Sequence, residues 1–211
     1  MSMRETKIIL TCCLGLVFLT PMRSAMAKIE TPTYQVIQSA GKIEVRKYSP
    51  MIVAEVEVSG ERGKAINAGF RILADYIFGN NAPGQNIAMT APVIQQKGEK
   101  IAMTAPVSQT PSGDLWKVRF TMPSSYTPET LPKPNNPAVK IISVPGHQTV
   151  AIRFSGFWWD RNLRKNLKKL DAFVRDRGLK TAGDPIYAFY NPPWTLPFFR
   201  RNEILYDLQE A

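Results

Sequence analysis

The same order of features occurs twice in this chain, about a hundred residues apart, and it restricts the possible folds more than any other pattern. Val53-Ala54 leads to Ser59-Gly60 and then to a run with helical spacing, and Val150-Ala151 leads to Ser155-Gly156 and a second such run. A duplication of this size predicts an α+β domain made of two pseudo-twofold-related repeats, with a cleft where the halves meet. Coincidence between short apolar patterns is the alternative.

Hydrophobic periodicity predicts the elements of each half. Apolar residues at helical spacing predict helices over 64–78 and 160–177, and Gly79-Asn80-Asn81 ends the first of them. The proline-rich segment 124–137 is expected to be a loop. Alternation of apolar and polar residues predicts strands at 34–38, 43–48, 51–58, 116–122, 150–154, 186–190 and 203–208.

A heptad, I-A-M-T-A-P-V, occurs at Ile87–Val93 and again at Ile101–Val107. With a turn at Lys97-Gly98 the two copies predict an antiparallel hairpin, in which Met89 and Met103 lie on the same face of one ribbon. Two thioethers so placed do not approach a heme iron from opposite sides. We therefore expect both methionines to fill core space, and iron ligation is the alternative.

The N-terminal segment has the pattern of a secretory signal peptide. Two basic residues precede an apolar run over 8–20, and Ala25-Met26-Ala27 supplies a small-x-small cleavage signal. The alternative, a transmembrane anchor, needs roughly 20 apolar residues. The sequence thus predicts a signal peptide over 1–27, one domain over 28–211, and a periplasmic or secreted product cleaved near Ala27.

Cleavage would change both the charge and the cysteine content. Removing residues 1–27 takes away three basic residues and one acidic residue, which lowers the formal net charge from +10 to +8. Both cysteines, Cys12 and Cys13, leave as well, so no disulfide, thiolate nucleophile or cysteine metal site is expected. The basic balance favours anionic partners.

His147 is the only histidine, and it follows Pro145-Gly146 at an expected turn. A solvated side chain is the expectation, and a heme-iron ligand is the alternative. A Ser-His-Asp arrangement would need this same residue as its base, and no nucleophile motif accompanies it. No P-loop, dinucleotide fingerprint or H-E-x-x-H motif occurs in the sequence.

The second predicted helix is amphipathic. Leu163, Leu167, Leu170 and Val174 form its apolar stripe. Its opposite face would suit an anionic membrane, although a merely solvated surface is the alternative and export disfavours nucleic acid. The basic residues of that face are Arg161, Arg164, Lys165, Lys168, Lys169, Arg175 and Arg177.

The segment from Tyr187 to Phe199 combines aromatic residues with closely spaced prolines. Proline prevents regular strand pairing, whereas the aromatic rings favour burial. A stiff aromatic loop can form the apolar wall of a ligand site, or it can seal one end of the core. Both interpretations remain open from the sequence.

Four strings in this order resemble bacterial proteins of the SOUL heme-binding family: the doubled heptad, Thr130–Asn135, Arg153–Gly156 and Tyr190–Glu203. The resemblance spans about 34–208. It implies a distorted antiparallel β-barrel flanked by two helices, a gyrase-inhibitor-like ligand-binding fold that binds heme or a related tetrapyrrole. In such relatives the porphyrin is thought to rest against the outer face of the first helix and a loop near the C-terminus.

Carried over by position, this resemblance implies a set of binding residues. Arg71 or Lys64 would pair with a propionate, and Asp75 would repel one unless it is itself paired. No strong axial ligation is expected. The residues implied to touch the tetrapyrrole are Lys64, Asn67, Arg71, Ala74, Trp194, Thr195 and Phe198.

The expected function is therefore non-enzymatic: a carrier or buffer for heme or another porphyrin in the cell envelope, with no nucleic-acid partner. One alternative is a hydrolase of small electrophiles that uses Glu55, Tyr48 or Tyr187 in the cleft between the repeats. The other is an envelope protein that binds anionic membrane weakly through the basic helix.

Overall fold

The computed structural model describes residues 29–82 and 98–209. The expected signal peptide and the first heptad copy, with Met89, lie outside the described residues. Among the residues described, no helix is long and apolar enough to cross a membrane.

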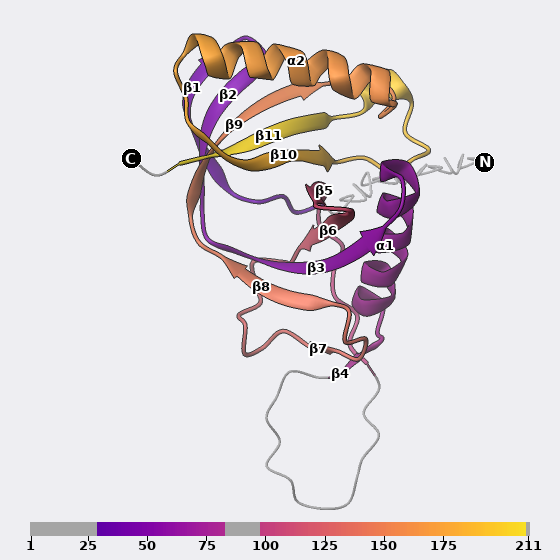
Figure 1. Cartoon of the computed structure of the whole chain (residues 1–211). Helices are drawn as coiled ribbons and strands as arrows, with labels where there is room; N and C mark the ends of the chain where they lie inside the picture. The colour runs from indigo at the N-terminus through magenta and orange to yellow at the C-terminus, as the bar shows by residue number, and fades with distance from the viewer. Residues whose placement is uncertain (1–28, 83–97, 210–211) are drawn as a thin grey trace, which may run out of the picture.

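Two helices and eleven strands make up the described chain (Figure 1). The helices are α1 (Arg62–Ile77) and α2 (Asp160–Asp176), each within two residues of its predicted bounds. A short 3-10 helix covers Pro197–Phe199. The strands are β1 (Tyr34–Ala40), β2 (Ile43–Tyr48), β3 (Met51–Ser59), β4 (Asn81–Ala82), β5 (Val107–Ser112), β6 (Leu115–Thr121), β7 (Lys133–Pro134), β8 (Lys140–Val144), β9 (His147–Phe154), β10 (Thr181–Phe189) and β11 (Asn202–Leu208).

Nine of the strands form one sheet, in the order β1-β2-β9-β11-β10-β5-β6-β3-β8, and all neighbouring strands in it are antiparallel. Eight of these strands form two matching halves: from one end the order is β2-β9-β11-β10, and from the other end it is β8-β3-β6-β5. The strands at equivalent places are β2 and β8, β9 and β3, β11 and β6, and β10 and β5. Each β–α unit of one half thus has a counterpart in the other. This is the arrangement that two repeats require.

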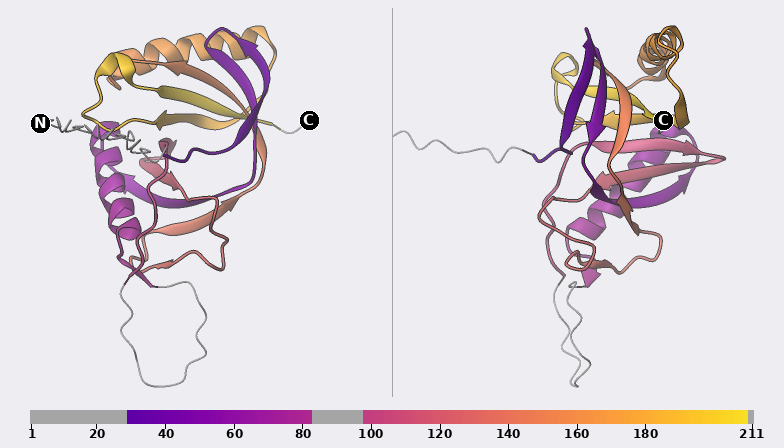
Figure 2. Two further views of the ribbon diagram at one scale, coloured as in Figure 1. Left: turned by 180° about the vertical axis from the view of Figure 1, so that it is seen from behind. Right: turned by 90° about the vertical axis from the view of Figure 1, so that its left-hand side faces the viewer.

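The expectation of a β-barrel is wrong, because the sheet curls but does not close. Its edges are β1 and β8, each paired to one neighbour only among the described strands. The two edges lie at opposite ends of the curled sheet (Figures 1 and 2). A bulge between Val36 and Gln38 interrupts the ladder of β1, and bulges in edge strands disfavour further pairing.

Each helix covers one half of the sheet and has its own core. Leu73 and Tyr76 of α1 pack with Val118 of β6, and Leu170 of α2 packs with Ile204 of β11. Successive strand residues point to opposite faces, so the sheet also has an inner face, turned away from the helices. A third cluster lies on that face: Tyr48, Ala151, Ala188 and Leu205.

The second heptad copy does not form the predicted strand. Residues 101–106 are irregular and β5 begins only at Val107. Here the backbone N–H groups bond outside any ladder: Ile101 donates to the Ile77 carbonyl at 2.8 Å and Ala105 donates to the Glu30 carbonyl at 2.9 Å. Without a ladder the alternation rule does not apply, and Met103 is 41% exposed instead of filling the core.

The contact between α1 and β6 leaves no room for a side chain at Gly69. A Cβ atom there would lie 2.6 Å from Cβ and Cγ2 of Val118. We expect Gly69→Ala to lower the free energy of unfolding by about 1–3 kcal/mol through overpacking. Gly63→Ala is the control, since its Cβ meets nothing within 4 Å, and it should gain up to about 1 kcal/mol of helix stability. Equal unfolding free energies for the two variants in urea would contradict this packing.

Candidate functional site

Two loops at one end of the molecule expose a group of large apolar side chains. One loop joins β9 to α2 and the other joins β10 to β11. We call this surface the aromatic corner. It consists of Phe157, Trp159, Trp194, Leu196, Phe198 and Phe199, all of them exposed.

Hydrogen bonds hold the two loops together. The Gly156 N–H donates to the Pro197 carbonyl at 2.8 Å, and the Asn202 amide donates to the Gly156 carbonyl at 3.0 Å. The guanidinium of Arg200, itself buried, donates to the Thr195 carbonyl at 2.7 Å and to the Pro193 carbonyl. The loops are therefore fixed from beneath, and their rings are presented on a preorganised frame.

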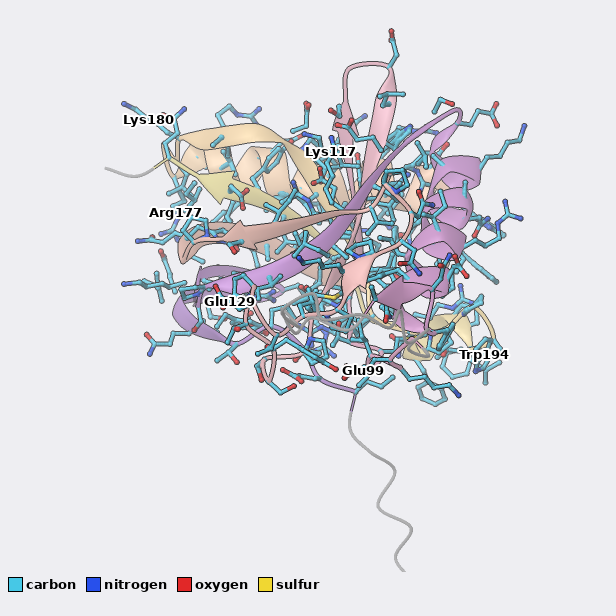
Figure 3. All side chains as sticks on the ribbon, turned by 90° about the horizontal axis from the view of Figure 1, so that it is seen from below. Glu99, Lys117, Glu129, Arg177, Lys180 and Trp194 are labelled. Carbon is cyan, nitrogen blue, oxygen red and sulfur yellow. The ribbon has the colours of Figure 1, made fainter. Side chains whose placement is uncertain are left out.

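The aromatic rings of the loop between β10 and β11 do not seal the core. Trp194 is 82% exposed and Phe198 is 65% exposed. Figure 3 shows Trp194 at the periphery of the molecule. Large rings fixed outside a core leave an exposed apolar patch, and such patches mark binding surfaces. Of the two interpretations of the loop, the structure favours the ligand wall.

The aromatic corner adjoins the first turn of α1 (Figure 1). Arg62 donates to the Trp158 carbonyl at 2.8 Å and to Oδ1 of Asp160 at 2.7 Å. These bonds tie the N-terminal end of α1 to the loop before α2. The loop before α2 in turn bonds to the loop near the C-terminus, from the Gly156 N–H to the Pro197 carbonyl, so it links that loop to α1.

The predicted residues of α1 extend along the helix from this end. Lys64, Asn67 and Arg71 are exposed and share one helical face. Lys64 lies in the first turn, whereas Arg71 lies about 10 Å further along the axis. Ala74 is buried and offers little surface. Asp75 accepts a hydrogen bond from the Asn80 amide at 2.6 Å, so it is partly compensated.

A cavity of about 580 Å³ lies elsewhere, beside β3 and the segment that precedes β1. None of the seven predicted binding residues lines it. Its described lining is mostly neutral, with Met51, Met122 and Tyr126 among the larger side chains, and Glu30 is its only charged residue. This chemistry does not suit a dicarboxylic acid.

The sequence predicted a turn at His147, but the structure shows that His147 is the first residue of β9. Its Nδ1 lies 2.9 Å from the Pro145 carbonyl oxygen, its Nε2 lies 3.5 Å from Oδ1 of Asp207, and its ring stacks on Tyr48. The aromatic corner begins beyond the other end of β9, about 23 Å away at the rise of a strand. Among the described residues no group of three or more His, Cys, Asp or Glu could hold a metal ion.

The inner face carries a buried ion network that the sequence did not predict. Arg46 donates to both carboxylate oxygens of Glu203, at 2.7 and 3.1 Å. Arg201 and the Tyr190 hydroxyl donate to the same carboxylate at 2.9 and 2.8 Å. Burial by itself would raise the pKa of Glu203, but these donors hold it below its usual range.

The hydrolase alternative gains no site from this geometry. Glu55 is buried on the inner face against Arg119, and Tyr48 lies on that face as an acceptor for Arg46. Tyr187 packs on the opposite face, in the α2 core. Burial raises the pKa of both tyrosines, which disfavours either as a base at neutral pH.

The sequence interpretation missed part of the aromatic corner. Phe157 and Trp159 come from the G-F-W-W-D string at 156–160, and the loop holds them stacked with centroids 4.5 Å apart. Three consecutive aromatic residues directly before a helix start, Phe157-Trp158-Trp159, were the available signal. Arg200, which supports the loop, had no such signal, since only the fold shows that it is buried.

The family model described as SOUL heme-binding protein matches residues 29–98 and 94–207. No curated protein sequence matches. Among solved structures, the C-terminal domain of EcmrR matches with a TM-score of 0.58 at 12% identity, over 84% of this chain and 99% of that one. A hydrolase from Listeria innocua matches with a TM-score of 0.51 at 13% identity, over 80% and 92%.

Such low identities show a shared fold and leave the activity open. The family match, in contrast, covers almost all of the described chain. This chain belongs to the SOUL heme-binding protein family.

Proposed function

We propose that this protein binds heme or a related tetrapyrrole at the aromatic corner, beside the first turns of α1, and acts as a carrier or buffer. The single observation that supports this most strongly is the set of exposed aromatic rings held on a hydrogen-bonded frame. A flat, largely apolar ring would cover them and remove their surface from water. Family membership supports the ligand class.

The propionates of such a ring need cations nearby. Lys64 is the exposed cation in the first turn of α1, and its only acidic contact among the described residues is Glu61, at 3.5 Å on the exposed surface. An exposed pair of this kind is weak and exchanges readily for a carboxylate ligand. Arg71 lies too far along the helix to contact the propionate that pairs with Lys64, so it could contact only the second propionate.

The aromatic corner is a better site for this ligand than the cavity. Among the described residues that line the cavity, Glu30 is the only charged one, and bringing two propionates beside a carboxylate is unfavourable. At the aromatic corner, in contrast, the adjoining first turn of α1 carries the exposed cation Lys64. The described residues offer no iron ligand at the aromatic corner: His147 is at the far end of β9. Burial of the ring, and not axial ligation, would supply the affinity.

Titration of the purified protein with hemin and with iron-free protoporphyrin tests this proposal. Affinities of the same order of magnitude are expected, because ring burial does not depend on iron. His147→Ala should leave the hemin affinity unchanged. A large preference for hemin that His147→Ala abolishes would show that iron ligation supplies the affinity and would contradict the proposed site.

We place this activity in the cell envelope because residues 1–27 have the pattern of a cleaved signal peptide. N-terminal sequencing of the protein from the envelope fraction should begin near Lys28. Recovery of a chain that retains residues 1–27 would contradict the cleavage.

A further inference from the structure

We infer that the aromatic corner, together with the first half of α2, docks on an anionic phospholipid bilayer. This inference goes beyond tetrapyrrole binding and does not depend on it. It rests on the apolar surface of two adjoining loops and on the charges that flank this surface.

The apolar part matches the interface of a bilayer. Trp159 is 64% exposed and Phe199 is 71% exposed, and both lie in loops that end at the surface. Trp159 stacks on Phe157 with an interplanar angle of 6°, so the pair presents a broad, stiff face. Tryptophan and phenylalanine on an exposed surface are typical of segments that insert at the headgroup level.

The flanking charge is positive. Arg161, Arg164, Lys165 and Lys168 of α2 are all exposed, and none has an acidic partner within 4.0 Å among the described residues. The acidic residue beside them, Asp160, is already paired with Arg62.

Glu61, at the start of α1, is likewise paired with Lys64. The charge of the aromatic corner is therefore complementary to anionic headgroups. Aromatic rings at the tip with basic residues beside them favour a lipid surface over nucleic acid, which would instead place stacking rings inside a basic groove.

The frame beneath the loops supports the same occupant. Arg200 and the Gly156–Pro197 bond fix the loops from beneath. Arg200 lies over the Phe157 ring, 5.3 Å from its centroid, but Trp159 and Phe199 stay exposed, so their insertion would not require unfolding. Docking in this orientation would place the proposed tetrapyrrole surface at the membrane, where apolar ligands partition. The basic face of α2 alone, which the sequence pointed to, thus acquires an apolar anchor at its N-terminal end.

Co-sedimentation with ligand-free vesicles tests the inference. Wild-type protein should bind vesicles of phosphatidylcholine with phosphatidylglycerol at low salt, and bind pure phosphatidylcholine at least tenfold more weakly. Lys165→Glu with Lys168→Glu should weaken binding to the anionic vesicles at least tenfold, since each charge near the surface contributes strongly. The matched control is Lys100→Glu with Lys133→Glu, near β4 and β7 at the opposite end of the molecule (Figure 1), which should retain most of the binding.

A second pair of variants tests the apolar part. Trp159→Ala with Phe199→Ala should weaken binding to anionic vesicles at least tenfold, whereas Phe78→Ala with Ile37→Ala removes equally exposed apolar groups elsewhere and should not. All four side chains are exposed, so the variants should fold normally. The inference would be overturned if wild-type binding did not depend on lipid charge, or if the test and control variants lost vesicle binding equally.

Discussion

Glu203→Gln is expected to lower the free energy of unfolding by about 3–5 kcal/mol. The carboxylate is 0% exposed and compensates two arginines, of which Arg46 is only 1% exposed. An amide cannot balance these charges, so the buried Arg46 would keep only Glu44 as a counter-ion, a partly exposed carboxylate 2.8 Å from its Nε. Denaturation in urea measures the loss.

Glu57→Gln is the matched control for this experiment. Glu57 lies on β3 and faces Lys117 across the surface at 3.8 Å, an exposed pair worth at most about 1 kcal/mol. A loss at Glu203 no larger than the loss at Glu57 would show that the buried network contributes nothing specific to stability.

The pH dependence of stability should carry the same signature. The pKa of Glu203 is lowered in the folded protein from a reference value of 4.5. A lowered carboxyl pKa contributes stability above the unfolded pKa and loses it as the pH falls toward the folded one. Wild-type stability should therefore decline below about pH 4.5, and Glu203→Gln should flatten that decline.

Trp194→Ala combined with Phe198→Ala is expected to weaken hemin binding at least tenfold and to shift the melting temperature little. Burial of one large side chain by a ligand is worth about 1.5–3 kcal/mol, and a tenfold change in Kd is about 1.4 kcal/mol. In the free protein both rings are exposed, so their removal creates no cavity. Absorbance titration gives the affinity and calorimetry gives the melting temperature.

Phe78→Ala is the control for the ligand site. Phe78 is also exposed, but it follows the C-terminal end of α1, away from the aromatic corner. The Phe78→Ala variant should bind hemin with the affinity of the wild type. Normal hemin affinity in the double variant would remove Trp194 and Phe198 from the site.

Local pattern predicted the elements that local residues determine. The first hairpin and both helices match the sequence, since their periodicity and glycine stops act over a few residues. The prediction of a strand over Ile101–Val107 was wrong, because the backbone there bonds to Ile77 and Glu30 instead of pairing with a neighbouring strand.

The long-range features were beyond such patterns. Arg46 and Glu203 are separated by 157 positions, and only the sheet order brings β2 and β11 to the two sides of β9. The resemblance placed the aromatic loop beside the first helix; in the structure Arg62 of that helix bonds to the loop before α2, and Gly156 of that loop bonds to Pro197 of the aromatic loop. It did not show that Ala74 is buried or that Phe157 and Trp159 extend the same surface.

The central claim is that a tetrapyrrole binds at the aromatic corner, and the most direct test is to locate the bound ligand. Iron-free protoporphyrin is diamagnetic, so amide proton–nitrogen correlation spectra can follow its binding residue by residue. We predict shifts at Lys64 and Asn67 and at the Trp194 indole, with Met51 and Tyr126 in the cavity unaffected. Shifts confined to Met51, Tyr126 and their neighbours would contradict the account and would move the ligand into the cavity.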